Sequence, residues 1–410
     1  MAAPALATLV FTVTRRELEL VPPAKPTPRE LKQLSDIDDQ ESLRFQIPVV
    51  HFYKRNPSVK GRDPVRVIRE PLAIAIVFYY PFAGRLREGQ AGKLSVDCTG
   101  EGVLFIEADA DDLQPPFPYF EHFLYDVPRS GGIIESPLLL IHVTRLKCAG
   151  FIFAFHHNHT VCDATGIVQF MTAITEMAHD ACVPSIPPVW QRHLLNARNP
   201  PRITTDEAVA TRAAAAFPLE KPAHRSLFFG PAKVSAVRRM VPIHQQERYF
   251  LLRTTRRLPV RCRTIALRLN PEEGVHVVVN VNKRSKFKPL LPRGYYGNAI
   301  AFATARTTAG KLCSNPLGYA IGLVKRAKGN VTEEYMRSLA DLINSHLRHA
   351  GFGGVEFGWG KPVYSGVAGA IPSETGFFVK SNIRGEEEIV VPVCLPTLAM
   401  ERFSKELESV

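Results

Sequence analysis

The stretch FHHNHTVCDATGIVQFM, residues 155–171, decides how the surrounding chain is interpreted. Its first half continues a strongly apolar segment that begins at residue 137, whereas the apolar residues after Asp163 follow helical spacing. The sequence therefore predicts a buried strand that ends at three clustered histidines, followed by a helix at about 163–179. Reactive side chains and backbone N–H groups converge at such junctions in α/β proteins, so the histidines are the first candidates for chemistry.

Three interpretations of the histidine cluster are open on these residues alone. In a strand, His157 and His159 share one face and His156 points the other way. A zinc site could add Cys162 and Asp163, but no second Cys or His group completes it, so we expect no metal. The histidines could instead be hydrogen-bonded core side chains. The third interpretation is a general base, because an imidazole with a pKa of about 6.5 is mostly neutral at cytosolic pH.

Motifs of several other enzyme and binding classes are missing from the sequence. There is no G-x-S-x-G elbow, which argues against serine hydrolysis. Neither a P-loop nor G-x-G-x-x-G occurs, and the glycines of 351–360 miss that spacing. The net charge of +12 suits an anionic partner, but basic residues are locally dense only at 256–263 and 283–288. The charge alone identifies no nucleic-acid site.

Cysteine usage and hydropathy indicate the compartment. The seven cysteines are dispersed without a C-x-x-C pair, which is typical of free thiols in a reducing compartment. The N-terminal apolar run lacks a preceding basic region, so we expect a strand there and not a signal peptide. No apolar run approaches the roughly 20 residues that span a bilayer. We therefore expect a cytoplasmic protein with no membrane partner.

Strand-like and helix-like segments alternate along the chain, which predicts an α/β protein. Residues 93–110 resemble a hairpin turned at TGEG, and 289–305 resemble a loop. The Pro- and Ala-rich segment 181–222 lacks sustained periodicity and predicts a linker between an N-terminal domain, 1–180, and a C-terminal domain, 223–410. The other expected elements are strands at 9–21, 47–54, 275–283 and 389–396, two strands within 137–160, and helices at 64–80, 315–329, 332–347 and 399–407.

The segment HTVCDATG, 159–166, matches the H-x-x-x-D signature of the plant BAHD acyl-CoA-dependent acyltransferases. The chain resembles this family over most of its length, and most closely its benzoyl-, acetyl- and coumaroyl-transferring branch. EFGWGKPVY is similar to the family's DFGWG element. The similar motifs occur in the family's order: LSDIDD (34–39), YYPFAGRL (79–86), VNKRSKF (281–287), LPRGYYGN (291–298) and EFGWGKPVY (356–364).

This resemblance implies an α/β fold of two chloramphenicol-acetyltransferase-like domains with mixed β-sheets and an active-site channel between them. It implies a monomeric O-acyltransferase that moves an aromatic or acetyl group from CoA to an alcohol of plant specialised or cell-wall metabolism. Acyl-CoA would be a co-substrate, with no permanently bound cofactor, no metal and no nucleic-acid partner. The acyl group, the acceptor and the choice between O- and N-acylation stay open.

The resemblance also assigns roles to matching residues. His159 would be the general base that removes the acceptor's hydroxyl proton. Asp163 would be structural, paired with Arg284 and facing away from the pocket, with Gly166 in the same supporting role. Trp359 would be a possible donor to the oxyanion. The structural motif around it would comprise Glu356, Phe357, Gly358 and Gly360.

The sequence departs from the family pattern in several places. Ala164 stands where the family has Gly, and Glu356 replaces the aspartate of DFGWG. The segments near 110, around 250 and at 343–350 are short or dissimilar. An alternative interpretation is therefore a degenerate, catalytically weak acyl-CoA-binding member of the family.

Overall fold

The computed structural model describes nine parts of the chain: 12–53, 55, 61–89, 92–111, 133–204, 222–239, 258–349, 379–381 and 388–408. The chain divides into two compact units. The first comprises 1–203, 284–299 and 337–366, and the second comprises 204–283, 300–336 and 367–410. Two segments from the second half of the sequence thus belong to the first unit. The division at 181–222 stays a prediction.

The first unit is built on a six-stranded sheet with the order β1-β7-β8-β9-β4, and β2 also pairs with β7. The sheet is mixed, because β7 and β8 are parallel whereas the other neighbours are antiparallel. The two strands predicted within 137–160 are confirmed, but the single strand predicted at 9–21 is two short ones. The strands are β1 (Val13–Arg15), β2 (Glu19–Val21), β4 (Gln46–Tyr53), β7 (Val103–Ala110), β8 (Leu139–Leu146) and β9 (Phe151–Asn158).

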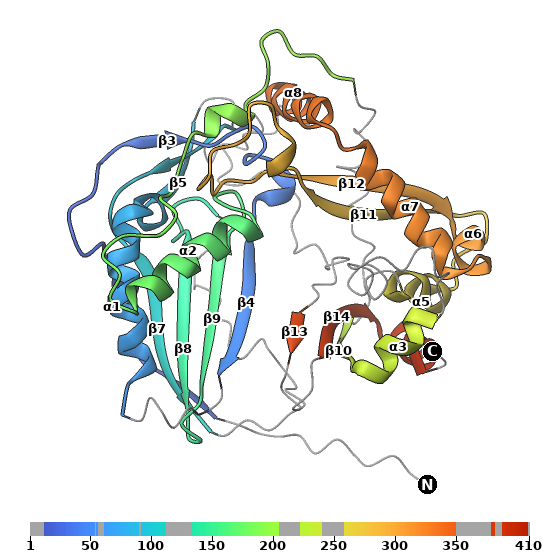
Figure 1. Cartoon of the computed structure of the whole chain (residues 1–410), viewed down its shortest axis with the longest axis horizontal. Helices are drawn as coiled ribbons and strands as arrows, with labels where there is room; N and C mark the ends of the chain where they lie inside the picture. Colours follow the sequence, from blue (N-terminus) through green and yellow to red (C-terminus); the bar gives the residue numbers. More distant parts are fainter. Residues whose placement is uncertain are drawn as a thin grey trace, which may run out of the picture. The chain divides into compact units, whose positions relative to one another are not determined.

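Two helices, α1 (Pro64–Phe78) and α2 (Ala164–Met177), lie on one face of this sheet (Figure 1). The Asp63 side chain accepts from the Val65 N–H and caps α1. Each large apolar side chain buried between helix and sheet contributes about 1.5–3 kcal/mol, so this core fixes the end of β9 against the start of α2. The core includes Leu72, Ile76, Phe105, Ile141, Phe153, Ile167 and Phe170.

The hairpin predicted at 93–110 is wrong. Its first strand, β6 (Leu94–Asp97), lies in a separate sheet of order β3-β6-β5, whereas β7 belongs to the large sheet. The segment between them passes from one sheet to the other, with the Cys98 N–H bonded to the Glu30 carbonyl. Alternating residues show that a strand forms, but they do not select its partner. The flanking strands are β3 (Leu31–Gln33) and β5 (Arg85–Glu88).

The second unit contains an antiparallel pair, β11–β12, and a three-stranded sheet of order β10-β14-β13. The predicted strands at 275–283 and 389–396 are confirmed, whereas the end of the loop predicted at 289–305, residues 300–305, is the start of β12. The strands are β10 (Pro222–Phe229), β11 (Gly274–Asn282), β12 (Ile300–Thr308), β13 (Val379–Ser381) and β14 (Glu388–Pro396). The helices that begin in this unit are α3 (Pro231–Arg239), α5 (Leu258–Leu267), α6 (Ala309–Ser314), α7 (Leu317–Asn330), α8 (Glu333–His349) and α9 (Thr397–Glu408).

Helix α8 continues into the first unit and occupies most of the short passage at 343–350. Its buried Asp341 accepts hydrogen bonds from the Arg198 N–H at 2.6 Å and the Arg202 N–H at 2.8 Å. The helix is therefore fixed to the chain before 204. Among the described helices, none is both long and apolar enough to cross a membrane.

Gly166, in the first turn of α2, lies unusually close to another segment. A Cβ built there would lie 2.0 Å from the Tyr296 carbonyl oxygen and 2.8 Å from the Cys162 Cβ. We expect Gly166→Ala to destabilise the protein by about 1–3 kcal/mol, because backbone must move. Gly329→Ala near the end of α7 is the control, since a Cβ there meets nothing within 4 Å. Thermal melting of both variants measures the effect, and equal melting temperatures would contradict the close packing.

Candidate active site

The histidine cluster lies where β9 ends and the chain turns into α2. The backbone N–H of His159 donates to the Phe45 carbonyl oxygen at 2.9 Å. The Thr160 N–H and hydroxyl both donate to Asn158 Oδ1, at 3.1 and 2.7 Å. Only 7% of His159 is exposed. The turn therefore holds this histidine in a fixed backbone position, almost covered by protein.

The alternation predicted for the three histidines is present. The rings of His157 and His159 are neighbours, with centroids 6.2 Å apart. His156 is in register with Leu140, which belongs to a different apolar cluster from that of Phe155. In the described ranges, no three His, Cys, Asp or Glu side chains lie close enough together to hold a metal ion.

Burial keeps two of the histidines uncharged. Desolvation, with a smaller contribution from the neighbouring imidazoles, lowers the pKa of His157 to about 3. Desolvation also lowers the pKa of His159, although the nearby Asp163 carboxylate opposes this effect. The His159 imidazole is therefore neutral at neutral pH and can accept a proton.

Asp163 anchors the beginning of α2. As the N-cap, its carboxylate accepts from the Thr165 and Gly166 N–H groups at 2.9 and 3.1 Å. Two Arg284 nitrogens donate to the same carboxylate at 2.6 and 2.8 Å, and the Ala299 N–H donates at 3.1 Å. The pairing of Asp163 with Arg284 is thus present as the resemblance implied. It connects α2 to the segment 284–299.

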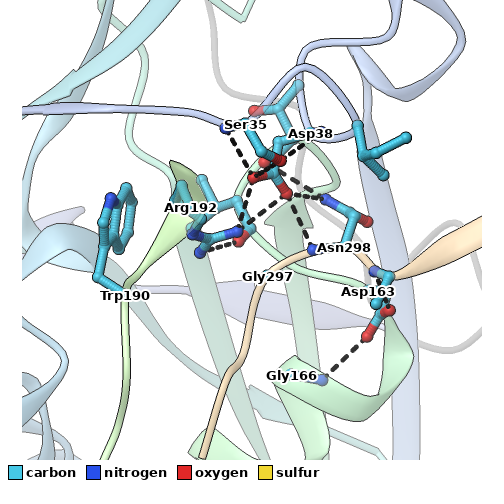
Figure 2. A network of polar contacts seen from close by, with 12 residues as sticks. Ser35, Asp38, Asp163, Gly166, Trp190, Arg192, Gly297 and Asn298 are labelled. Carbon is cyan, nitrogen blue, oxygen red and sulfur yellow. Dashed lines mark hydrogen bonds and ion pairs between the residues drawn. The ribbon is translucent and has the colours of Figure 1, made fainter. Parts of the chain in front are cut away.

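A second buried carboxylate, Asp38, was not assigned by sequence reasoning. It is fully buried and accepts from the Ser35 N–H at 3.1 Å and the Ser35 hydroxyl at 2.6 Å. Arg192 Nη1 lies 2.9 Å from both carboxylate oxygens, and the Asn298 N–H and Nδ2 donate at 2.9 and 2.8 Å (Figure 2). Asp38 therefore joins three segments that are distant in the sequence.

Arg192 connects this carboxylate to the histidine turn, because its Nη2 donates to the Val161 carbonyl at 2.8 Å. Its guanidinium also stacks 4.2 Å from the Trp190 ring centre. A Cβ at Gly297 would lie 1.9 Å from Arg192 Nη1, so the chain needs glycine there. Arg192 lies in the predicted linker, where no periodicity marked it. The only sequence signals were the LSDIDD and YYGN motifs that contain its neighbours.

Several predicted residues lie outside the described part of the chain, and their roles stay predictions. Residues 112–132 and 240–257, which include parts of the dissimilar segments near 110 and 250, also lie outside the described residues. The residues are Trp359, Glu356, Phe357, Gly358 and Gly360.

Comparisons with known proteins find relatives along nearly the whole chain. The family model described as "Transferase family" matches residues 11–410. The chain is 56% identical to "Benzyl alcohol O-benzoyltransferase" of Petunia hybrida, over 98% of this chain and 94% of the relative. It is 48% identical to "13-hydroxylupanine O-tigloyltransferase" of Lupinus albus, over 99% and 96%. The first alignment spans 433 positions, more than the 410 residues of this chain, so the relative has residues that this chain lacks.

Solved structures show the same fold. Vinorine synthase aligns with a TM-score of 0.71 at 20% identity, over 97% of this chain and 98% of the other. F. graminearum TRI101 complexed with ethyl coenzyme A aligns with a TM-score of 0.64 at 13% identity, over 92% and 97%. The expected α/β fold of chloramphenicol-acetyltransferase type with mixed sheets is confirmed.

Removing one partner of the Asp163–Arg284 pair leaves a buried charge uncompensated. We expect Asp163→Ala to lower the free energy of unfolding by about 3–5 kcal/mol. The double variant with Arg284→Ala should lose less than the sum of the single variants, because they share one interaction. Urea unfolding of all three measures the coupling. Strict additivity would argue against a direct energetic link.

The buried neutral His157 makes stability depend on pH. Its pKa is about 3 in the folded chain and about 6.5 in an unfolded chain. The unfolded state therefore binds the extra proton first, and stability is lost as the pH falls from about 6.5 toward 3. We expect His157→Leu to reduce this slope by up to about 1.4 kcal/mol per pH unit. Urea unfolding between about pH 5 and pH 7 tests it, and parallel slopes for both proteins would contradict it.

Proposed function

This chain belongs to the plant BAHD family of acyl-CoA-dependent acyltransferases, and we propose that it transfers an aromatic acyl group to a small alcohol with His159 as the general base. It is an O-acyltransferase. The observation that carries the base assignment is the neutral, nearly covered imidazole of His159 at the junction of β9 and α2. The names of the benzoyltransferase relatives support benzoyl-CoA and benzyl alcohol as the first substrates to test.

The proposed reaction uses His159 twice. Its neutral imidazole removes the acceptor's hydroxyl proton as that oxygen attacks the thioester carbonyl carbon. When the tetrahedral intermediate collapses, the C–S bond breaks and the imidazolium returns the proton to the leaving thiolate. The ester and free CoA thiol are the products. The negatively charged oxygen of the intermediate needs a donor, and the Trp359 indole N–H is the proposed one.

Asp163, Arg284 and Gly166 are proposed to support the site without touching substrate. The carboxylate of Asp163 is already occupied by the α2 N–H groups and by Arg284. The oxygens of this carboxylate already accept hydrogen bonds from these partners, so they have little remaining capacity to bind substrate. This arrangement supports the division of roles in which His159 carries out the chemistry.

We also propose a cytoplasmic monomer that uses acyl-CoA as a co-substrate and has no permanently bound cofactor, nucleic-acid partner or membrane partner. Structures of TRI101 contain coenzyme A, which supports the co-substrate. The alternative of a degenerate CoA-binding protein gains no support from the relatives, which are named as transferases.

We expect His159→Ala to lower kcat by about 10²–10⁴-fold, because proton transfer contributes that much to such steps. His156→Ala is the matched control on the opposite face of β9 and should lose far less. Release of free thiol from benzoyl-CoA in the presence of benzyl alcohol measures turnover. Thiol release must depend on the acceptor, and equal losses in both variants would remove His159 from its proposed role.

The pH profile gives a second test of the same assignment. Because burial lowers the pKa of His159, kcat/KM should stay level down to pH values below about 6.5 and then fall as the imidazole is protonated. An acid limb at or above that value would contradict a buried base.

A further inference from the structure

Two of the three aspartates of LSDIDD, Asp36 and Asp39, contact Lys93, whereas Asp38 binds other parts of the chain. Asp36 accepts from Lys93 Nζ at 2.5 Å and from the Ala197 N–H at 2.7 Å. Asp39 accepts from Arg44 Nη2 at 2.9 Å and from the Leu94 N–H at 3.1 Å. Among these three carboxylates, within the described residues, Asp38 is the one whose partners also bond to the histidine turn. Of the aspartates in the LSDIDD motif, Asp38 is thus the one connected to the turn that contains His159.

The link from Asp38 runs through the side-chain amide of Asn298. Its Nδ2 donates to Asp38 Oδ1 at 2.8 Å and to the His159 carbonyl oxygen at 2.8 Å. A carboxylate and a carbonyl can only accept hydrogen bonds, so the amide nitrogen must lie on this side. The orientation of the Asn298 amide is therefore fixed by its partners, and its Oδ1 must point in the other direction.

Two buried polar atoms complete the link. Asn298 Oδ1 and His159 Nδ1 are both buried, and neither has a hydrogen-bond partner among the described residues. The Asn298 side chain nevertheless lies close enough to the His159 imidazole to raise its pKa against the larger effect of burial. Catalytic hydrogen bonds are often long in the free enzyme and tighten in the complex. An amide oxygen can only accept, so it would select the imidazole tautomer with the proton on Nδ1.

We propose that Asp38 is a positioning residue that orients the Asn298 amide, so that Nδ2 holds the His159 carbonyl and Oδ1 receives the Nδ1 proton. This leaves the lone pair on His159 Nε2 free to accept the proton of the attacking hydroxyl. When the imidazolium forms, the amide oxygen stabilises its Nδ1–H. The inference rests on the proposed role of His159 as the base.

Asn298→Ala tests the link directly, because it removes both contacts and leaves Asp38 paired with Arg192. We expect kcat to fall about 10–100-fold, as for other small misplacements of a catalytic group, with KM for benzoyl-CoA little changed. The acid limb of kcat/KM should move to lower pH, because the Asn298 side chain raises the pKa of His159 against the larger effect of burial. A purely structural role would lower the melting temperature without moving the limb.

Asp38→Asn should reproduce this loss of kcat and this shift of the limb. Asp39→Asn is the matched control, since the same chemical change is made at an equally buried aspartate of the same loop. It should keep the wild-type limb and nearly the wild-type kcat. In the double variant Asp38→Asn/Asn298→Ala, kcat should fall no further than in Asn298→Ala alone, because Asp38 acts through Asn298.

The proposal is overturned if the kcat losses of the two single variants multiply in the double variant. It is also overturned if the Asp38→Asn enzyme keeps the wild-type kcat and the wild-type acid limb of kcat/KM. Should Asp38→Asn fail to fold, the acid limb of Asn298→Ala decides alone, and an unmoved limb overturns it. His159→Ala is run in parallel to separate the two hypotheses. If it stays active, the general-base assignment fails. If it is inactive while Asn298→Ala keeps the wild-type kcat and limb, only the positioning inference fails.

Discussion

The geometry around His159 depends on two buried carboxylates, each bound by one arginine. Asp163 is held by Arg284, and Asp38 by Arg192. Replacing such pairs by apolar residues is often neutral or stabilising, so they are poor explanations of stability. Their directional hydrogen bonds instead determine which segments meet. The requirement that each buried charge is paired therefore positions His159, the proposed base.

The strands and helices could be predicted well from local periodicity, whereas strand partners could not. The β9–α2 junction was clear because apolar spacing changes from period 2 to helical spacing at Asp163. The prediction of a β6–β7 hairpin was wrong because the residue pattern of each strand is compatible with several neighbouring strands. Contacts between distant segments, such as the Cys98–Glu30 hydrogen bond beside the β3–β6 pairing, determine the partner, and no local pattern contains them.

The same contrast applies to the site. His159, Asp163 and Arg284 could be assigned because the family resemblance provides a role for each. Arg192 could not, because its segment has neither periodicity nor a motif, and its partners Asp38 and Val161 are distant in the sequence. Asn298 was visible within YYGN, but its function depends on the direction of one amide. The orientation of this amide depends on the residues that surround it in the folded protein.

The buried ion pairs of the LSDIDD loop and the exposed charges of this enzyme respond differently to salt. Its aspartates are compensated by Lys93, Arg192 and Arg44, so the loop takes up little of the overall charge of +12. Buried pairs are screened weakly by salt, whereas exposed charges are screened strongly. Ionic strength therefore acts on the encounter with a polyanionic acyl donor. The buried pairs around the proposed base are screened little, so we expect ionic strength to affect the capture of substrate more than the chemical step.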